Sequence, residues 1–113
     1  MPCLAVYTNL PKDKVPGDFL QQASVFLGNQ LAKPEHYVTV RLHPDQMMMH
    51  GGSSDLCGFV ELYNISDGAK NKEHALAIAE FLESKLSIPK NRFYVTFTNL
   101  KRGDVALDGK TFA

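Results

Sequence analysis

Tryptophan is absent from this sequence, cysteine occurs only twice, and neither sign of charge is in surplus. Lysine plus arginine and aspartate plus glutamate each total 12, so the formal net charge is zero. Nucleic-acid-binding domains usually carry a basic surplus, and polybasic membrane anchors need one as well. We therefore expect neither nucleic acid nor a membrane surface as a partner.

The few cysteines and histidines do not form a pattern that predicts a disulfide or a metal site. Cys3 and Cys57 cannot build a disulfide framework and are typical of thiols in a reducing compartment such as the cytosol. Val60 stands where a C-x-x-C redox motif would need its second cysteine. No histidine has metal-ligand spacing with either cysteine, so we expect no metal. The histidines are His36, His43, His50 and His74.

Long hydrophobic runs are missing too. No apolar segment approaches the roughly 20 residues that a membrane-spanning helix needs. The first residues lack the charged start and long apolar stretch of a signal peptide. What remains is a chain of 113 residues with 44% hydrophobic and 21% charged residues, which is typical of one globular domain spanning residues 1–113.

The hydrophobic periodicity alternates between strand and helix patterns. We expect strands at 3–9, 37–42, 57–63 and 93–99, and helices at 18–32 and 72–86. Asp18 suits the N-cap of the first helix, and Pro34 disfavours its continuation. The tail after residue 99 contains Gly103 and Gly109 and is expected to hold a short hairpin or strand.

The two halves of the chain repeat each other. The first half runs strand, helix, "LAKP", "YVTV", and the second runs strand, helix, "LSIP", "YVTF". Each half therefore reads as a βαβ unit. Two such units predict an α+β fold of the ferredoxin-like type, with a four-stranded mixed sheet and two helices on one face.

One face of this sheet has no predicted helix to cover it. In the last strand Phe93, Val95 and Phe97 should face the helices, which leaves the intervening Tyr94, Thr96 and Thr98 on the other side. The first strand, "CLAVYTN", is apolar on both faces. A chain this small has few elements left for the second face, so this pattern favours association between subunits.

Pro2 and Lys33 are the first candidate site residues, and each also has an ordinary structural interpretation. Pro2 is a permissible second residue; once Met1 is removed, however, its secondary amine could act as a general base if burial or a nearby cation lowers its pKa. Lys33 complements a helix dipole, or it binds a substrate carboxylate. The repeat places Ile88 at the position equivalent to Lys33, so the fold alone does not require lysine there.

Two further motifs are weaker. The segment "MMMHGGSSD" offers a tight turn or an anion nest, but no G-K-[ST] follows, so it is not a P-loop. The strand order also fits an RNA-recognition module, and Gly58, Phe59 and Val60 match its third-strand motif. Other positions of that motif do not match, and the zero net charge disfavours this alternative. The mismatched positions are Asp55, Leu56, Cys57 and Leu62.

An ordered set of short motifs, running from end to end, resembles the family of macrophage migration inhibitory factor and D-dopachrome tautomerase. These motifs are "MP" at 1–2, "TNLP" at 8–11, "VP" at 15–16, "FL" at 19–20, "KP" at 33–34, Tyr37, "PDQ" at 44–46, "GGSS" at 51–54, Cys57, Ile65, Asn71, Tyr94 and "TFA" at 111–113.

The resemblance implies a homotrimeric keto–enol tautomerase for phenylpyruvate-like and dopachrome-like substrates, without a cofactor. It assigns Pro2 as the catalytic base and Lys33 as the residue that meets the substrate carboxylate. It further implies a pocket with Tyr94 supplied by a neighbouring subunit. The remaining substrate-binding positions are Tyr37, Ile65, Asn64 (where a serine is usual) and Thr96 (where an asparagine is usual).

The resemblance also implies a second class of function. Some family members act as cytokine-like proteins through a cell-surface receptor, and members leave cells without a signal peptide. We therefore expect a cytoplasmic protein, or one secreted without a signal peptide, whose partners are a small aromatic keto or enol substrate, its own copies and a receptor. A non-catalytic receptor-binding protein is the alternative. Leu107 replaces a tail tryptophan of the family, which bears on substrate preference.

Overall fold

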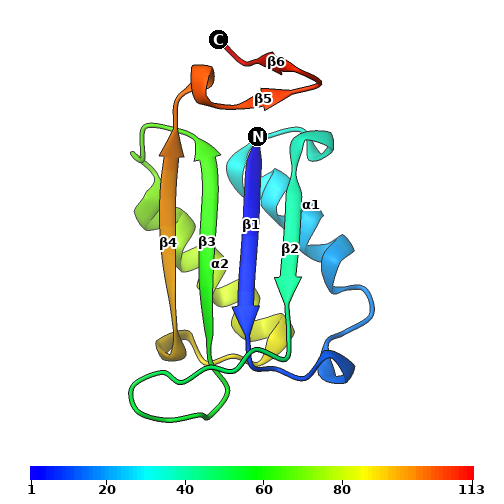
Figure 1. The fold of residues 1–113 in the computed structure, drawn as a ribbon, viewed down its shortest axis with the longest axis vertical. Coiled ribbons are helices and arrows are strands. Elements are labelled where there is room, and N and C mark those ends of the chain that lie inside the picture. The colour runs from blue at the N-terminus through cyan, green and yellow to red at the C-terminus, as the bar shows by residue number, and fades with distance from the viewer.

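The strand patterns form a four-stranded mixed sheet. The computed structural model describes residues 1–113. Its strands are β1 (Pro2–Thr8), β2 (Thr39–His43), β3 (Gly58–Ile65) and β4 (Phe93–Leu100), in the order β2-β1-β3-β4 (Figure 1). β1 is parallel to β2 and antiparallel to β3, and β3 is parallel to β4. The predicted α+β fold with two βαβ units is confirmed.

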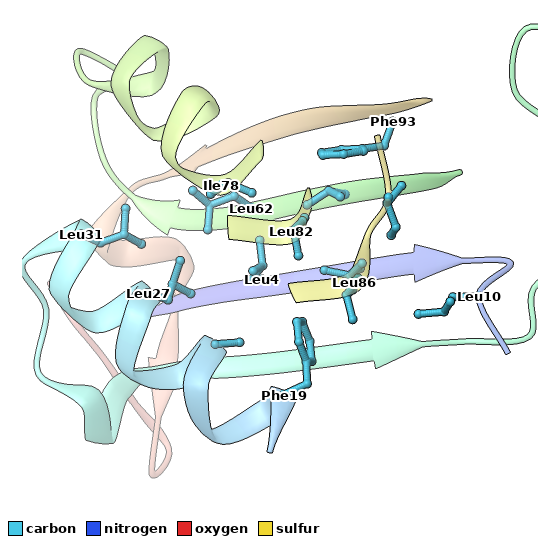
Figure 2. Close-up of a cluster of buried hydrophobic side chains, with 14 residues drawn as sticks. Leu4, Leu10, Phe19, Leu27, Leu31, Leu62, Ile78, Leu82, Leu86 and Phe93 are labelled. Carbon is cyan, nitrogen blue, oxygen red and sulfur yellow. The ribbon is translucent and has the colours of Figure 1, made fainter. Parts of the chain in front are cut away.

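Helices α1 (Phe19–Leu31) and α2 (Asn71–Leu86) pack on one face of the sheet, as predicted (Figure 1). Their apolar stripes, alternate residues of the strands and the loop residues Leu10 and Ile88 form a core of 14 buried hydrophobic residues between the two layers (Figure 2). Leu4 of β1, Leu27 of α1 and Leu82 of α2 are each fully buried in it. Burial of one such side chain stabilises the fold by roughly 1.5–3 kcal/mol.

The ends of the elements differ slightly from the predicted ranges. Asp18 precedes α1, but its carboxylate does not cap a backbone N–H and instead accepts a hydrogen bond from the Gln22 side chain. Residues Glu35–Tyr37 form a short 3-10 turn, so β2 begins at Thr39 rather than at residue 37. Pro34, with its fixed extended conformation before this turn, separates α1 from β2.

Both helices end on a non-glycine residue in the left-handed region, Ala32 after α1 and Ser87 after α2. At the end of α1 the backbone N–H of Lys33 donates to the Gly28 carbonyl at 3.0 Å, which fixes the direction in which the chain leaves the helix. Glycine is the usual residue at such a position because a Cβ is crowded there.

We expect Ala32→Gly to stabilise the protein by about 1 kcal/mol, because it removes the cost of a Cβ at φ 53°. Chemical denaturation should show a higher midpoint with an unchanged m value. Ala77→Gly, in the interior of α2, is the matched control and should destabilise by about 1 kcal/mol. A loss of stability in Ala32→Gly would contradict this explanation of the helix end.

The predicted C-terminal hairpin is present as β5 (Ala106–Leu107) and β6 (Lys110–Thr111). Asp108 and Gly109 turn the chain between them, both with positive φ, as the Asp-Gly dipeptide of a tight hairpin requires. Figure 1 shows this hairpin lying across the end of the sheet at which β1 begins. The two chain ends therefore lie at the same end of the sheet.

The long connection between β2 and β3 lies at the opposite end of the sheet. The Arg92 guanidinium donates to the backbone carbonyls of His50, Leu56, Ser53 and Asp55 at 2.8–3.3 Å. These bonds explain the "GGSS" segment as a loop closed around a structural arginine. The sequence had left open a tight turn or an anion nest.

The second face of the sheet carries no helix. Phe93 is buried and Val95 and Phe97 pack against the core, whereas Tyr94 and Thr96 are exposed, as the alternation predicts. Cys3 and Ala5 of the central strand are nevertheless buried on this open face.

Both cysteines are free. Neither helix has the length and hydrophobicity that a membrane-spanning helix needs.

Candidate active site

The N-terminus is fixed in the sheet from its second residue onward. Pro2 is the first residue of β1 and lies opposite Asn64 of β3, and the next residue, Cys3, is flanked by Thr39 of β2 and Tyr63 of β3. The Pro2 side chain is less than 2% exposed. A chain end is usually mobile, but here sheet pairing holds it in one place.

Two adjoining pockets open at the N-terminus. The charged pocket, about 190 Å³, is lined by Met1, Lys33, Pro34, Tyr37, Ile65, Arg102 and Phe112. The apolar pocket, about 240 Å³, is lined by Met1, His36, Tyr37, Val38, Thr39, Ala106, Leu107 and Phe112. Met1, Tyr37 and Phe112 line both, so one cleft has a cationic end and an apolar end.

The end of α1 and the C-terminal hairpin position several residues that line this cleft. The left-handed end of α1 directs the chain into Lys33 and Pro34, and the following 3-10 turn presents Tyr37. The hairpin returns Phe112, whose backbone N–H donates to the carbonyls of Arg102 and Val105 at 3.2 and 3.1 Å. The rings of Tyr37 and Phe112 meet edge to face, with centroids 5.8 Å apart.

The electrostatics of the cleft favour a neutral amine. Burial and, to a smaller extent, the positive charge of Lys33 lower the pKa of the α-amino group of Met1 from its ordinary 8.0. Both effects disfavour the protonated form, since burial removes water from the charge and a like charge repels it. Both effects therefore favour the neutral amine, whose nitrogen carries a basic lone pair.

Of the residues predicted for the site, Lys33, Ile65 and Tyr37 lie together around the start of β1. Asn64 lies next to them but faces another pocket, of about 310 Å³, that Lys33, Ile65 and His74 also line. Asn64 is 7% exposed, and its side-chain oxygen has no hydrogen-bond partner within the chain.

Tyr94 and Thr96 lie elsewhere in the chain. Tyr94 is opposite Phe59 on β3, five residues from Asn64, the partner of Pro2. At about 3.3 Å per residue, this places Tyr94 roughly 17 Å from Pro2 along the sheet. Thr96 is opposite Glu61, and its hydroxyl donates to the Val60 carbonyl at 3.1 Å. A single chain does not join these two residues to the cleft.

Sequence reasoning missed Arg102. β4 runs parallel to β3, so both strands finish at the same end of the sheet, with Leu100 opposite Ile65. Arg102, which follows β4, therefore lines the cleft beside Ile65. The available signal was a pair of basic residues, Lys101 and Arg102, shortly after the strand predicted at 93–99. The largest surface pocket, about 500 Å³ between α1 and α2, contains neither the N-terminus nor any predicted site residue.

Comparison with known proteins agrees with this arrangement over the full chain. A family model described as macrophage migration inhibitory factor matches residues 1–113. The macrophage migration inhibitory factor homolog of Trichinella spiralis is 40% identical over 114 residues, which cover 99% of this chain and 100% of the homolog. The factor of Xenopus tropicalis is 34% identical over 115 residues and covers both chains completely.

Solved structures agree as well. The macrophage migration inhibitory factor from Trichinella spiralis superimposes with a TM-score of 0.92 at 38% identity and covers 97% of this chain and 99% of its own. A homologue from Prochlorococcus marinus has a TM-score of 0.87 at 27% identity, with 98% and 99% of the two chains covered.

Proposed function

This chain belongs to the macrophage migration inhibitory factor family, and from that premise we propose that it catalyses keto–enol tautomerisation of phenylpyruvate-like and dopachrome-like compounds, with Pro2 as the general base. Family membership supports a tautomerase or cytokine-like function in general. The specific reaction is carried by one observation: an amine at the start of β1 has a lowered pKa, with Lys33 beside it in a cleft.

The proposed base is the nitrogen of Pro2 after removal of Met1. In the chain that keeps Met1, this nitrogen belongs to a peptide bond and has no basic lone pair. Removal of Met1 moves the free amine of the chain by one residue, to the buried Pro2 that begins β1. The proximity of Lys33 and the buried position favour the neutral amine there, as they do for the α-amino group of Met1.

The two ends of the cleft match the two ends of an aromatic 2-oxo acid. Lys33 at the cationic end would bind the carboxylate, and the apolar pocket around Val38 and Leu107 would hold the ring. Pro2 would take a proton from the carbon beside the carbonyl, the C–H electrons would form the C=C bond, and a proton would be taken up on the carbonyl oxygen. A positioned base of this kind contributes about 10²- to 10⁴-fold.

We further propose a homotrimer in which Tyr94 of one subunit completes the cleft of the next. Two observations support association through the open face: Tyr94 is 67% exposed there, and Phe59, its partner on β3, is 38% exposed. A Tyr94 on a neighbouring chain could reach the cleft even though it lies far from Pro2 in its own chain.

The test follows Met1 and turnover together. Protein that retains Met1 by intact mass should show no phenylpyruvate tautomerisation above the uncatalysed rate. Treatment with a methionine aminopeptidase should then restore activity in proportion to the fraction that loses one methionine. Activity in fully Met1-retaining protein would rule out Pro2 as the base, and a processed protein with no activity on either substrate would rule out the tautomerase.

A further inference from the structure

We propose that Arg102 is a second substrate-binding residue that, with Lys33, recognises the carboxylate of the substrate and makes the cleft select 2-oxo acids over their neutral esters. This inference rests on the proposed tautomerase and adds a residue and a selectivity to it. It is carried by the place of Arg102 in the charged pocket and by the partners that its guanidinium lacks.

Arg102 is held at the cleft by its backbone. It begins the 3-10 turn Arg102–Asp104, one residue after the end of β4, and its carbonyl accepts a hydrogen bond from the backbone N–H of Phe112. Phe112 itself lines both pockets, so the C-terminal segment and the arginine are fixed against the same wall. The position of Arg102 therefore follows from the sheet and the hairpin.

The Arg102 guanidinium has no structural task within the chain. By contrast, Arg92 has a clear structural role, because its guanidinium donates four hydrogen bonds to loop carbonyls. Arg102 makes no side-chain hydrogen bond and no ion pair, and the charged pocket is lined by no aspartate or glutamate. A planar guanidinium with free donors binds a carboxylate through two parallel hydrogen bonds.

Lys33 and Arg102 would have different tasks. Besides burial, Lys33 is the cation that lowers the pKa of the α-amino group of Met1, and Arg102 does not contribute to that shift. Lys33 therefore acts on both the base and the substrate, whereas Arg102 acts on the substrate alone. An arginine that merely added positive charge to the cleft would also change the pH dependence of the base. An arginine that binds only the substrate carboxylate would not.

The experiment compares Arg102→Gln with two matched variants in the processed protein. Arg102→Gln should raise KM for phenylpyruvate about tenfold and leave the pH dependence of kcat/KM and the KM for the methyl ester unchanged. Lys33→Gln should raise KM and also move the pH profile. Lys101→Gln removes a neighbouring charge that does not line the pocket and should change neither.

A binding measurement keeps this proposal separate from the catalytic one. Affinity for 3-phenylpropanoate, which has the ring and carboxylate but no reacting carbonyl, is measured by NMR titration in wild-type protein and in Arg102→Gln. The variant should bind it about tenfold more weakly and bind its methyl ester equally well. Equal affinity for the acid in both proteins, or an equal loss for acid and ester, would overturn the role of Arg102 whether or not the protein is a tautomerase.

Discussion

Replacing Pro2 by glycine is expected to lower kcat for phenylpyruvate tautomerisation by about 10²- to 10⁴-fold, the range that a positioned general base contributes. Glycine still provides an amine, but it lacks the ring that packs in the wild type with less than 2% exposure. Without that packing the amine is free to move at the end of β1. The main loss should therefore be in kcat, because the proposed binding of the substrate carboxylate by Lys33 does not depend on Pro2.

The control for this variant is Pro16→Gly, which changes an exposed proline in the loop before α1 and should leave kcat unchanged. Circular dichroism and the oligomeric mass of Pro2→Gly should match those of the wild type. Full turnover in a folded Pro2→Gly protein would contradict the role given to the packed proline at this position. Receptor-dependent signalling that persists in this variant would support the cytokine-like alternative alongside the loss of catalysis.

The pH dependence supplies a second readout of the same base. Only the neutral amine accepts a proton, so kcat/KM should rise with pH through the amine's pKa and be constant above it. Burial and Lys33 lower the pKa of the α-amino group of Met1 below its ordinary 8.0. We expect the same two effects to act on the amine of Pro2, so this rise should be complete at a lower pH than for an ordinary chain terminus. Lys33→Gln removes one of the two causes and should move the rising limb to higher pH.

The fold could be predicted from the sequence because its signals are local and repeated. The helical stripes and the repeated "LAKP" and "LSIP" segments define both βαβ units, and the structure confirms them. The helix ends were less predictable. The start of α1 suggested a side-chain cap by Asp18 that does not form, and its end places an alanine where glycine is expected.

The candidate site was predictable only in part, because its residues come from distant segments. Lys33, Tyr37 and Ile65 could be found by resemblance to a family, and they lie together around the start of β1, the strand that begins at Pro2. Arg102 belongs to no motif of the resemblance and reaches the cleft only because β4 is parallel to β3. For Tyr94 even the structure of one chain is not enough, since its proposed role depends on a second chain.

The proposed sharing of each cleft between two chains predicts the second large effect, which is complementation between two inactive variants. Tyr94→Ala is expected to lose most activity because it removes an exposed ring proposed to close the neighbouring cleft. Pro2→Gly loses activity through the base. Unfolding the two proteins together and refolding them as mixed trimers should restore activity, since some clefts then combine an intact Pro2 with an intact Tyr94.

The expected recovery follows from how a head-to-tail ring is built. In an equal mixture each cleft takes Pro2 from one chain and Tyr94 from the next, so about a quarter of the clefts should be intact on both sides. If both residues served the same cleft within one chain, no mixture would contain an intact cleft and activity would not recover. Tyr94 lies five residues along β3 from the position opposite Pro2, roughly 17 Å away, which favours recovery. The measurement is tautomerase activity per subunit in the refolded mixture, with each variant refolded alone as its control.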